Sequence, residues 1–341
     1  MTSLLSYPGA VEASWPDEGV AAHYGDPFRE QRAIESSAGV VDRSNRGVLR
    51  ITGPDRRSWL HSLTTQHLDG LPAGESTQAL VLSPTGHVEH HLTLTDDGTA
   101  TWIHTEPGMA ASLLEFLESM RFMLRVEPAD ISGEVAVLSV LGPAAADVVA
   151  GLEGVQANVT ASSFGVIDLI VARDGLPDAA AKLAERGAAV AGMWAFEALR
   201  IAARVPRFGL DTDHRTIPHE VGWIDTAVHL SKGCYRGQET VARVHNLGHP
   251  PRRLVFLHLD GSVDRLPAHG DPVEAAGATV GFTGSTARHY ELGPIGLALV
   301  KRTVPVDQTL LAGGVAAAQE VIVPPDAGAN VKVTLRRRQL M

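Results

Sequence analysis

The chain contains 341 residues, enough for two or three domains, and carries a formal net charge of −10 at pH 7. This acidic balance argues against nucleic acid as a partner, because phosphate neutralisation needs a basic face. The single cysteine excludes an intrachain disulfide, a structural zinc site with several thiolates, and a four-thiolate iron–sulfur cluster held by one chain. No stretch approaches the roughly 20 apolar residues that span a bilayer, so we expect a soluble, cytoplasmic protein without a membrane partner.

The N-terminal part of the chain opens without a clear periodic pattern. Its first 25 residues contain several prolines and glycines and are predicted to form a loosely structured lead-in. Asp26 and Pro27 then have the pattern of an N-cap followed by proline at the first helical position. With Gly39 as the C-terminal stop, this pattern predicts a helix over 27–38.

A strand, a Gly-Pro pair and a helix occur in this order twice. In the first instance Gly53-Pro54 follows a strand and precedes a helix with Trp59, Leu60 and Leu63 on one face. In the second, Gly142-Pro143 follows an apolar strand and precedes a helix rich in alanine and valine. The two instances lie about ninety residues apart and indicate a duplicated α+β scaffold.

The remaining periodic segments divide the chain into an α+β part and an all-β part. Between and after the two units we expect strands near 79–83, 88–95, 100–104 and 166–172, and helices over 107–120, 177–186 and 192–205. After Pro250-Pro251 the sequence predicts only strands, at 253–259, 272–275, 278–285, 293–302 and 331–336. Five or six short strands without a helix indicate a small barrel or sandwich.

The only cysteine lies in a short segment between two cations and two glycines. The glycines disfavour a helix through Cys234, because each costs about 1 kcal/mol relative to alanine. Residues 238–243 have a composition compatible with a helix. Cys234 is therefore predicted on a tight loop ahead of a helix N-terminus, where Lys232 and Arg236 favour the thiolate. The alternative is a small buried hydrophobe, which is the usual role of a free cysteine.

Histidines near the cysteine and on one strand raise two other possibilities. A cysteine hydrolase would need a positioned base, and the candidates are His229, His245 and His249. A metal site could start from His87, His90 and His91. No carboxylate or thiolate at matching spacing completes such a site, so we expect a solvated or hydrogen-bonded strand surface and no metal.

The stretch from Pro218 to Arg243 combines a carboxylate, aromatic rings and cations. Such a set suits a flat heterocycle with an anionic tail, because aromatic rings stack on it, a carboxylate accepts from ring N–H groups, and a cation pairs with the tail. The predicted binding residues are Glu220, Trp223, Tyr235, Gln238 and Arg243.

The residues around the cysteine match a known signature. The run from Lys232 to Glu239 fits the K-G-C-Y-x-G-Q-E motif of the YgfZ-type folate-binding proteins and their mitochondrial iron–sulfur assembly relatives, and the similarity extends over about residues 30–300. The wider superfamily is that of the glycine-cleavage T-protein, a tetrahydrofolate-dependent aminomethyltransferase. The resemblance implies an α+β, three-domain cloverleaf with folate in the central cavity. Residues 1–250 would form two intertwined α+β subdomains, with about 48–130 inserted as the second, and 251–341 a C-terminal β-barrel.

Two departures from the T-protein bear on activity. Where that enzyme has a paired Asp-Asp after a glycine-containing turn, this chain aligns as the run from Gly86 to Leu92, in which histidine replaces the aspartate that would polarise the folate nitrogen. A carboxylate of the T-protein loop is replaced by Cys234. The resemblance therefore implies that the folate pocket is kept and that the aminomethyltransferase chemistry is lost.

These observations predict a tetrahydrofolate-binding accessory protein that supports assembly or repair of iron–sulfur clusters. Cys234 and Lys232 would be its reactive groups, and iron–sulfur assembly proteins or client enzymes its partners. The alternatives are a folate-dependent aminomethyl or one-carbon transferase, and a scaffold whose pocket is vestigial.

Overall fold

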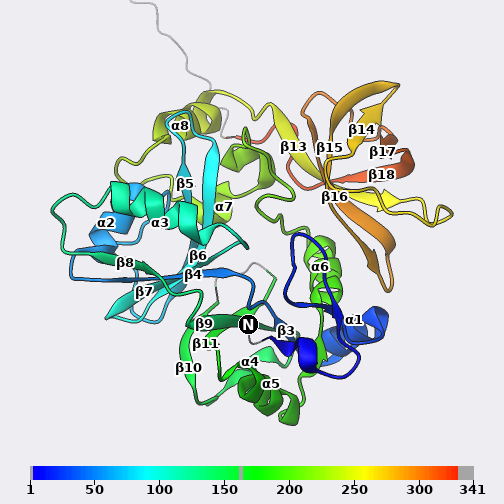
Figure 1. The fold of residues 1–341 in the computed structure, drawn as a ribbon. Helices are drawn as coiled ribbons and strands as arrows, with labels where there is room; N and C mark the ends of the chain where they lie inside the picture. The colour runs from blue at the N-terminus through cyan, green and yellow to red at the C-terminus, as the bar shows by residue number, and fades with distance from the viewer. Residues whose placement is uncertain (1–2, 161–163, 329–341) are drawn as a thin grey trace, which may run out of the picture.

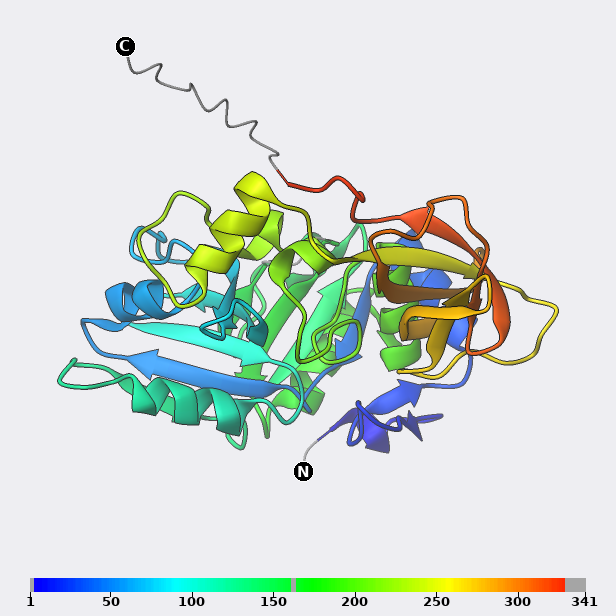
Figure 2. The same ribbon diagram turned by 90° about the horizontal axis from the view of Figure 1, so that it is seen from above.

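The computed structural model describes residues 3–160 and 164–328, so the strand predicted at 331–336 lies outside the described residues. Figure 1 shows two sheet-and-helix lobes and a barrel around a common centre. Figure 2 shows the barrel at the opposite end of the molecule from helices α2 (Arg56–Leu63) and α3 (Ala110–Ser119). No helix in the described ranges is long and apolar enough to cross a membrane.

The first lobe is built on a five-stranded sheet of order β10-β11-β9-β3-β12. Its strands are β3 (Gly39–Asp42), β9 (Val135–Leu141), β10 (Val155–Val159), β11 (Ile167–Ala172) and β12 (Ala189–Ala191). The helices that pack on it are α1 (Pro27–Ser36), α4 (Ala145–Val149), α5 (Leu176–Glu185) and α6 (Met193–Ala202). Asp26 caps α1 as predicted, since its carboxylate accepts from the N–H groups of Phe28 and Arg29 at 3.0 Å. Gly39 does not end that helix but opens β3.

The second lobe is built on a sheet of order β5-β6-β7-β4-β8. Its strands are β4 (Gly47–Thr52), β5 (Ser76–Leu82), β6 (Val88–Asp96), β7 (Ala100–Thr105) and β8 (Glu127–Asp130). Helices α2 and α3 cover the face of this sheet that points away from the first lobe, where Trp59, Leu60 and Leu63 are buried as the periodicity predicts.

The C-terminal part is a closed barrel of order β13-β16-β15-β14-β17-β18. Its strands are β13 (Arg252–Leu259), β14 (Pro272–Ala275), β15 (Ala278–His289), β16 (Gly293–Lys301), β17 (Leu310–Ala312) and β18 (Val315–Val321). The predicted barrel is confirmed, but the last two strands were not expected. A core cluster that includes Leu80, Trp223, Tyr235 and Phe256 joins the barrel to the second lobe.

The N-terminal segment corrects the expectation of a loose lead-in. It forms a short 3-10 helix (Leu4–Ser6) and the paired strands β1 (Val11–Glu12) and β2 (Ala21–His23). Between the strands, the buried carboxylate of Asp17 accepts two hydrogen bonds at 2.8 Å from Arg207. The prediction failed because this partner lies 190 residues away in the chain.

The segment that links the first lobe to the barrel carries three short helices. These are the 3-10 helix η2 (Pro218–Val221), α7 (Ile224–Ala227) and α8 (Gln238–Leu247). The cysteine loop lies directly ahead of α8, as the sequence predicts.

Candidate functional site

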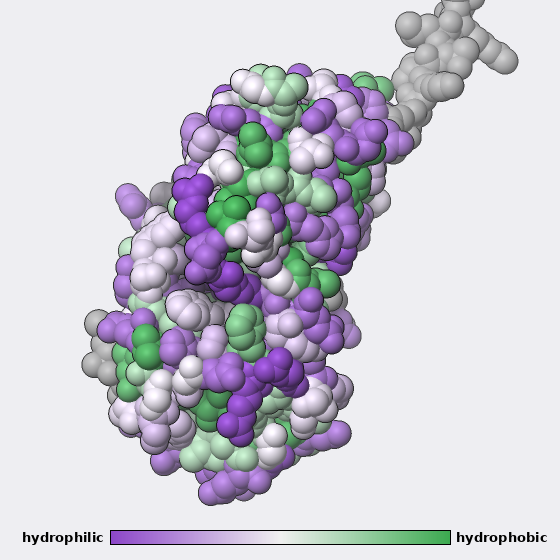
Figure 3. Space-filling model, turned by 90° about the vertical axis from the view of Figure 1, so that its right-hand side faces the viewer, coloured by the Kyte–Doolittle hydropathy of each residue, from purple (hydrophilic) through white to green (hydrophobic). Residues whose placement is uncertain are grey.

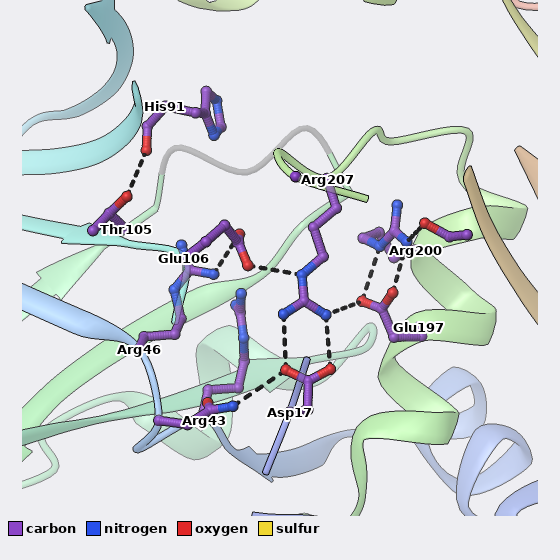
Figure 4. Close-up of polar contacts among 12 residues, drawn as sticks. Asp17, Arg43, Arg46, His91, Thr105, Glu106, Glu197, Arg200 and Arg207 are labelled. Carbon is purple, nitrogen blue, oxygen red and sulfur yellow. Dashed lines mark hydrogen bonds and ion pairs between the residues drawn. The ribbon is translucent and has the colours of Figure 1, made fainter. Parts of the chain in front are cut away.

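A small polar pocket, called the inner pocket here, lies where the two lobes meet α6. Its volume is about 70 Å3. Charged and polar side chains dominate its lining, among them Arg43, Arg46, Gln78, His91, His104, Glu106, Asp168, Arg200 and Arg207. Figure 4 shows Arg43 and Arg46 from the turn between β3 and β4, His91 from β6, Glu106 directly after β7, Arg200 from α6 and Arg207 from the segment after α6.

Arg207 is the centre of the charge network at this pocket. Its Nε donates to Glu106 at 2.7 Å, its two terminal nitrogens donate to Asp17, and one of them lies 3.4 Å from Glu197. Burial alone would raise the pKa of Glu106, but Arg207 and Arg46 outweigh burial and hold that pKa well below its usual value. The buried carboxylate of Glu106 is therefore ionised at neutral pH.

A second chain of contacts forms the floor of the pocket. Arg46 Nε donates to His104 Nδ1 at 2.9 Å, so His104 carries its proton on Nε2, which lies 3.1 Å from Asp168. Burial would raise the pKa of Asp168, but His104 and Arg43 lower it strongly. The floor is thus fixed in one protonation state at neutral pH.

His91 belongs to the run from Gly86 to Leu92, in which the T-protein resemblance puts histidine in place of an aspartate. Its ring stacks on Trp223 with centroids 4.6 Å apart, and its Nε2 lies 3.0 Å from Gln78 Oε1. Because an amide oxygen only accepts, Nε2 carries the proton and Nδ1 is left as an acceptor. Burial lowers the pKa of His91 to about 4, so the ring is neutral at pH 7. The ring is therefore a neutral, half-buried imidazole with a hydrogen-bond partner, which agrees with the expected solvated or hydrogen-bonded strand surface.

The predicted heterocycle contacts are spread over several places. Glu220 is fully buried and accepts two hydrogen bonds at 2.8 Å from Arg252. Trp223 reaches the inner pocket only through the ring of His91. Tyr235 belongs to the core beneath the barrel, and Gln238 donates to the Lys232 carbonyl within the cysteine loop.

Lys232 holds the cysteine loop against the second lobe. Its Nζ donates to the carbonyl oxygens of His61 and Thr64, at the C-terminal end of α2. A cation is stabilising there because the last carbonyls of a helix lack internal partners. Burial lowers the pKa of Lys232 to about 8 and raises that of the neighbouring Tyr235 to about 12.

Two glycines allow the cysteine loop to pack closely against the turn between β5 and β6. Gly237 has φ +82°, and a Cβ there would lie 2.6 Å from the Ser83 carbonyl oxygen. A Cβ on Gly86 would in turn meet Thr240 of α8 at 2.8 Å. The turn between β5 and β6 and the start of α8 can therefore approach this closely only because both residues lack side chains.

Cys234 is exposed, so the alternative of a buried hydrophobe is wrong. Two of the nearby histidines contact other histidines: His229 lies 5.2 Å from His67, and His245 lies 6.0 Å from His219, between ring centroids. Arg243 lies on α8, beyond the loop. Among residues 3–160 and 164–328, no group of three His, Cys, Asp or Glu is arranged to hold a metal ion.

His219 gives a testable pH dependence. It is buried, neither ring nitrogen has a partner among the described residues, and burial lowers its pKa to about 4 from 6.5. Between these values the unfolded state binds the extra proton, so stability falls as pH drops from 6.5 to 4. His219→Phe should make this fall shallower by up to about 1.4 kcal/mol per pH unit in urea unfolding. The exposed His214→Phe is the control, and identical profiles for wild type and His219→Phe would contradict a neutral buried ring.

The described geometry has close counterparts among known proteins. Residues 22–174 match the family described as the GCVT N-terminal domain. The crystal structure of glycine cleavage system aminomethyltransferase T from Bartonella henselae superposes with a TM-score of 0.80 and 19% identity, covering 94% of this chain and 96% of that one. The chain has the aminomethyltransferase T fold.

Sequence relatives agree with this fold. The chain is 27% identical over 294 residues to an aminomethyltransferase of Symbiobacterium thermophilum, covering 76% of each. It is 24% identical over 321 residues to a putative chloroplastic transferase of Arabidopsis thaliana, covering 84% of this chain and 70% of the relative. These matches support the aminomethyltransferase superfamily, and the predicted α+β fold with a C-terminal barrel is confirmed.

The aminomethyltransferase T fold and the sequence resemblance imply tetrahydrofolate in the centre of the molecule. The inner pocket does not fit it. A space of about 70 Å3 holds roughly two waters, whereas small-molecule sites usually measure about 300–1,000 Å3. The ion pairs of Arg207 and Arg46 occupy the space between the lobes.

The sequence did not single out Asp17, Arg46, Glu106 or Arg207 as site residues. Their contacts join positions 60 to 190 residues apart, and no local spacing links them. The one available signal is the loop at 209–215, which is dense in ionisable residues and starts just after Arg207.

Proposed function

We propose that this protein binds a reduced folate and acts as a one-carbon transferase, with tetrahydrofolate as the acceptor. The observation that carries the proposal is the aminomethyltransferase T fold over 94% of the chain. Further support comes from the aminomethyltransferase relatives, whose similarity extends over about three quarters of each chain. This was the alternative in the sequence-based prediction, and the comparisons favour it over the accessory role.

A second candidate is an accessory protein for iron–sulfur clusters, as in the YgfZ-type proteins. It is favoured by the cysteine loop, in which three residues make structural contacts and leave the thiol free to react. Lys232 caps α2, Tyr235 is buried in the core, and Gly237 permits a close backbone approach, whereas Cys234 is exposed. Since the chain has one thiol, a cluster contact through Cys234 would be shared with a partner protein.

One set of measurements separates the two candidates. Calorimetry with tetrahydrofolate tests binding, and ammonia release from an aminomethyl donor in the presence of tetrahydrofolate tests transfer. We expect binding and turnover in the wild type, and unchanged turnover in Cys234→Ser and in the loop control Ser231→Ala. No heat at millimolar folate would contradict binding.

Binding without turnover would reject the transferase. The accessory role would then require that Cys234→Ser, but not Ser231→Ala, fails to restore iron–sulfur enzyme activities in cells depleted of this protein. Full rescue by Cys234→Ser would reject the accessory role of the thiol.

A further inference from the structure

A second, larger cavity, called the outer cavity here, lies between the N-terminal segment, α1, α6 and strand β15 of the barrel. Its volume is about 710 Å3, ten times that of the inner pocket and within the usual range for small-molecule sites. Figure 3 faces this side of the molecule, with the barrel above and the first lobe below. The outer cavity and the inner pocket share no lining residue, so they are separate spaces in this structure.

A layer of ion pairs, called the ion-pair wall here, lies between the two spaces. Asp17 and Glu197 line the outer cavity, whereas Glu106, Arg200 and Arg207 line the inner pocket. Arg207 donates to Asp17 at 2.8 Å and lies 3.4 Å from Glu197. The Arg200 guanidinium contacts Glu197 at 2.6 Å, and Figure 4 shows these side chains meeting in one network. Because each of these pairs joins a residue of one space to a residue of the other, a single layer of side chains separates the spaces here.

One side of the ion-pair wall belongs to an exposed turn. Asp17 lies between β1 and β2, and its neighbours Trp15 and Glu18 are exposed. The Asp17 carboxylate is buried and is held by polar groups, the guanidinium of Arg207 and the side-chain amide of Asn45 at 3.2 Å. Charges and hydrogen bonds therefore attach this turn to the wall.

Contacts of this kind can open at a lower cost than an apolar core. Deleting one partner of a buried ion pair leaves the other charge without compensation, whereas separating an intact pair lets water hydrate both charges. Hydration then offsets much of the free energy lost with the ion pair. The wall is thus a place where the molecule can open while the apolar clusters of the two lobes stay packed.

We propose that the ion-pair wall is a gate between the outer cavity and the centre of the molecule, with residues 14–19 as its moving part. Lifting this turn withdraws Asp17 from Arg207, and rotation of the released guanidinium joins the two spaces. The joined space exceeds the 710 Å3 of the outer cavity, which is enough for a reduced folate to reach the centre between the lobes and the barrel. The inference rests on the proposed function, and it assigns the inner pocket of about 70 Å3 to the closed state of the site.

The test measures how fast 5-formyltetrahydrofolate, a stable reduced folate, binds, by stopped-flow tryptophan fluorescence. Because opening precedes binding, the observed rate should reach a plateau as the ligand concentration rises. Asp17→Asn keeps the size of the side chain but removes its charge, so the open state should be more populated. We expect the plateau rate to rise about ten-fold and the apparent Kd to fall by up to the same factor.

Two further variants serve as checks. Glu197→Gln weakens the same wall from α6 and should act in the same direction, so the test does not depend on the folding of Asp17→Asn alone. Asp264→Asn removes a charge whose side chain is 98% exposed and which pairs with Arg288 at the outer cavity, and it should change neither constant. Circular dichroism checks that each variant is folded.

Hydrogen exchange of the ligand-free protein gives a readout that does not need folate. Amides of residues 12–20 should exchange faster in Asp17→Asn than in the wild type, because the turn is released more often. Exchange over α5, in the first lobe, should be the same in both proteins. Equal exchange over residues 12–20 would overturn the gate.

Failure of the gate and failure of the proposed function are distinguishable. If the wild type binds with a rate that rises linearly with ligand concentration, and Asp17→Asn binds at the same rate, the gate is wrong and the proposed function stands. Binding by Asp17→Asn without binding by the wild type would support the gate. If neither folded protein binds the probe, the proposed function fails and the gate to its site fails with it.

Discussion

Replacing Arg207 by methionine should lower the free energy of unfolding by about 3–5 kcal/mol, which is the usual cost of breaking a buried ion pair by removing one partner. The guanidinium is 5% exposed and contacts Asp17, Glu106 and Glu197. Without it, three largely buried carboxylates would be left with less compensating positive charge. Urea unfolding monitored by circular dichroism measures the change.

The control for this prediction is Arg125→Met. Arg125 pairs with Asp55 at 2.7 Å, but its side chain is 73% exposed, and exposed pairs contribute about 1 kcal/mol or less. A loss in Arg207→Met no larger than in Arg125→Met would show that the network is not what holds the N-terminal segment in place.

Gly142→Ala should strongly destabilise the first lobe, with a loss of about 2–5 kcal/mol in the free energy of unfolding. The residue has φ +112°, and a Cβ there would overlap the Ile34 carbonyl oxygen and lie 2.6 Å from that of Ser37. Both atoms are backbone and cannot move without displacing α1. Gly53 has the same place in the first of the two units made of a strand, a Gly-Pro pair and a helix. Its φ is +102°, and a Cβ there would overlap the Arg125 backbone.

The comparison variant is Gly133→Ala. This glycine lies outside the left-handed region and has no heavy atom within 4 Å of an added Cβ. Alanine there should change stability by less than about 1 kcal/mol, in either direction. Thermal unfolding of the two variants gives the comparison, and equal melting temperatures would contradict the steric explanation.

Most elements could be predicted because their signals are local. Asp26-Pro27 marks the start of α1, the two Gly-Pro pairs mark the ends of β4 and β9, and the absence of helical periodicity after Pro251 marks the barrel. These patterns need only neighbouring residues. The short strand β17 carries too few residues to show a period and was missed.

The site could not be predicted to the same extent, because it depends on contacts between distant segments. Lys232 was selected as a cation near the thiol, but only the folded chain brings it to the end of α2. Trp15 and Trp194 share a cavity although they are far apart in the sequence, and neither belongs to a motif. In contrast, the exposure of Cys234 and the helix that follows it agree with local glycine and charge patterns.

The exposure of Cys234 also makes the protein a natural single-site labelling target. Because the chain has no other thiol, a maleimide dye or spin label reacts at one defined place without any substitution. A photocrosslinker attached there would record which macromolecules approach the loop that precedes α8. The same residue thus gives experimental access to the partners of this protein, whichever of the two proposed roles is correct.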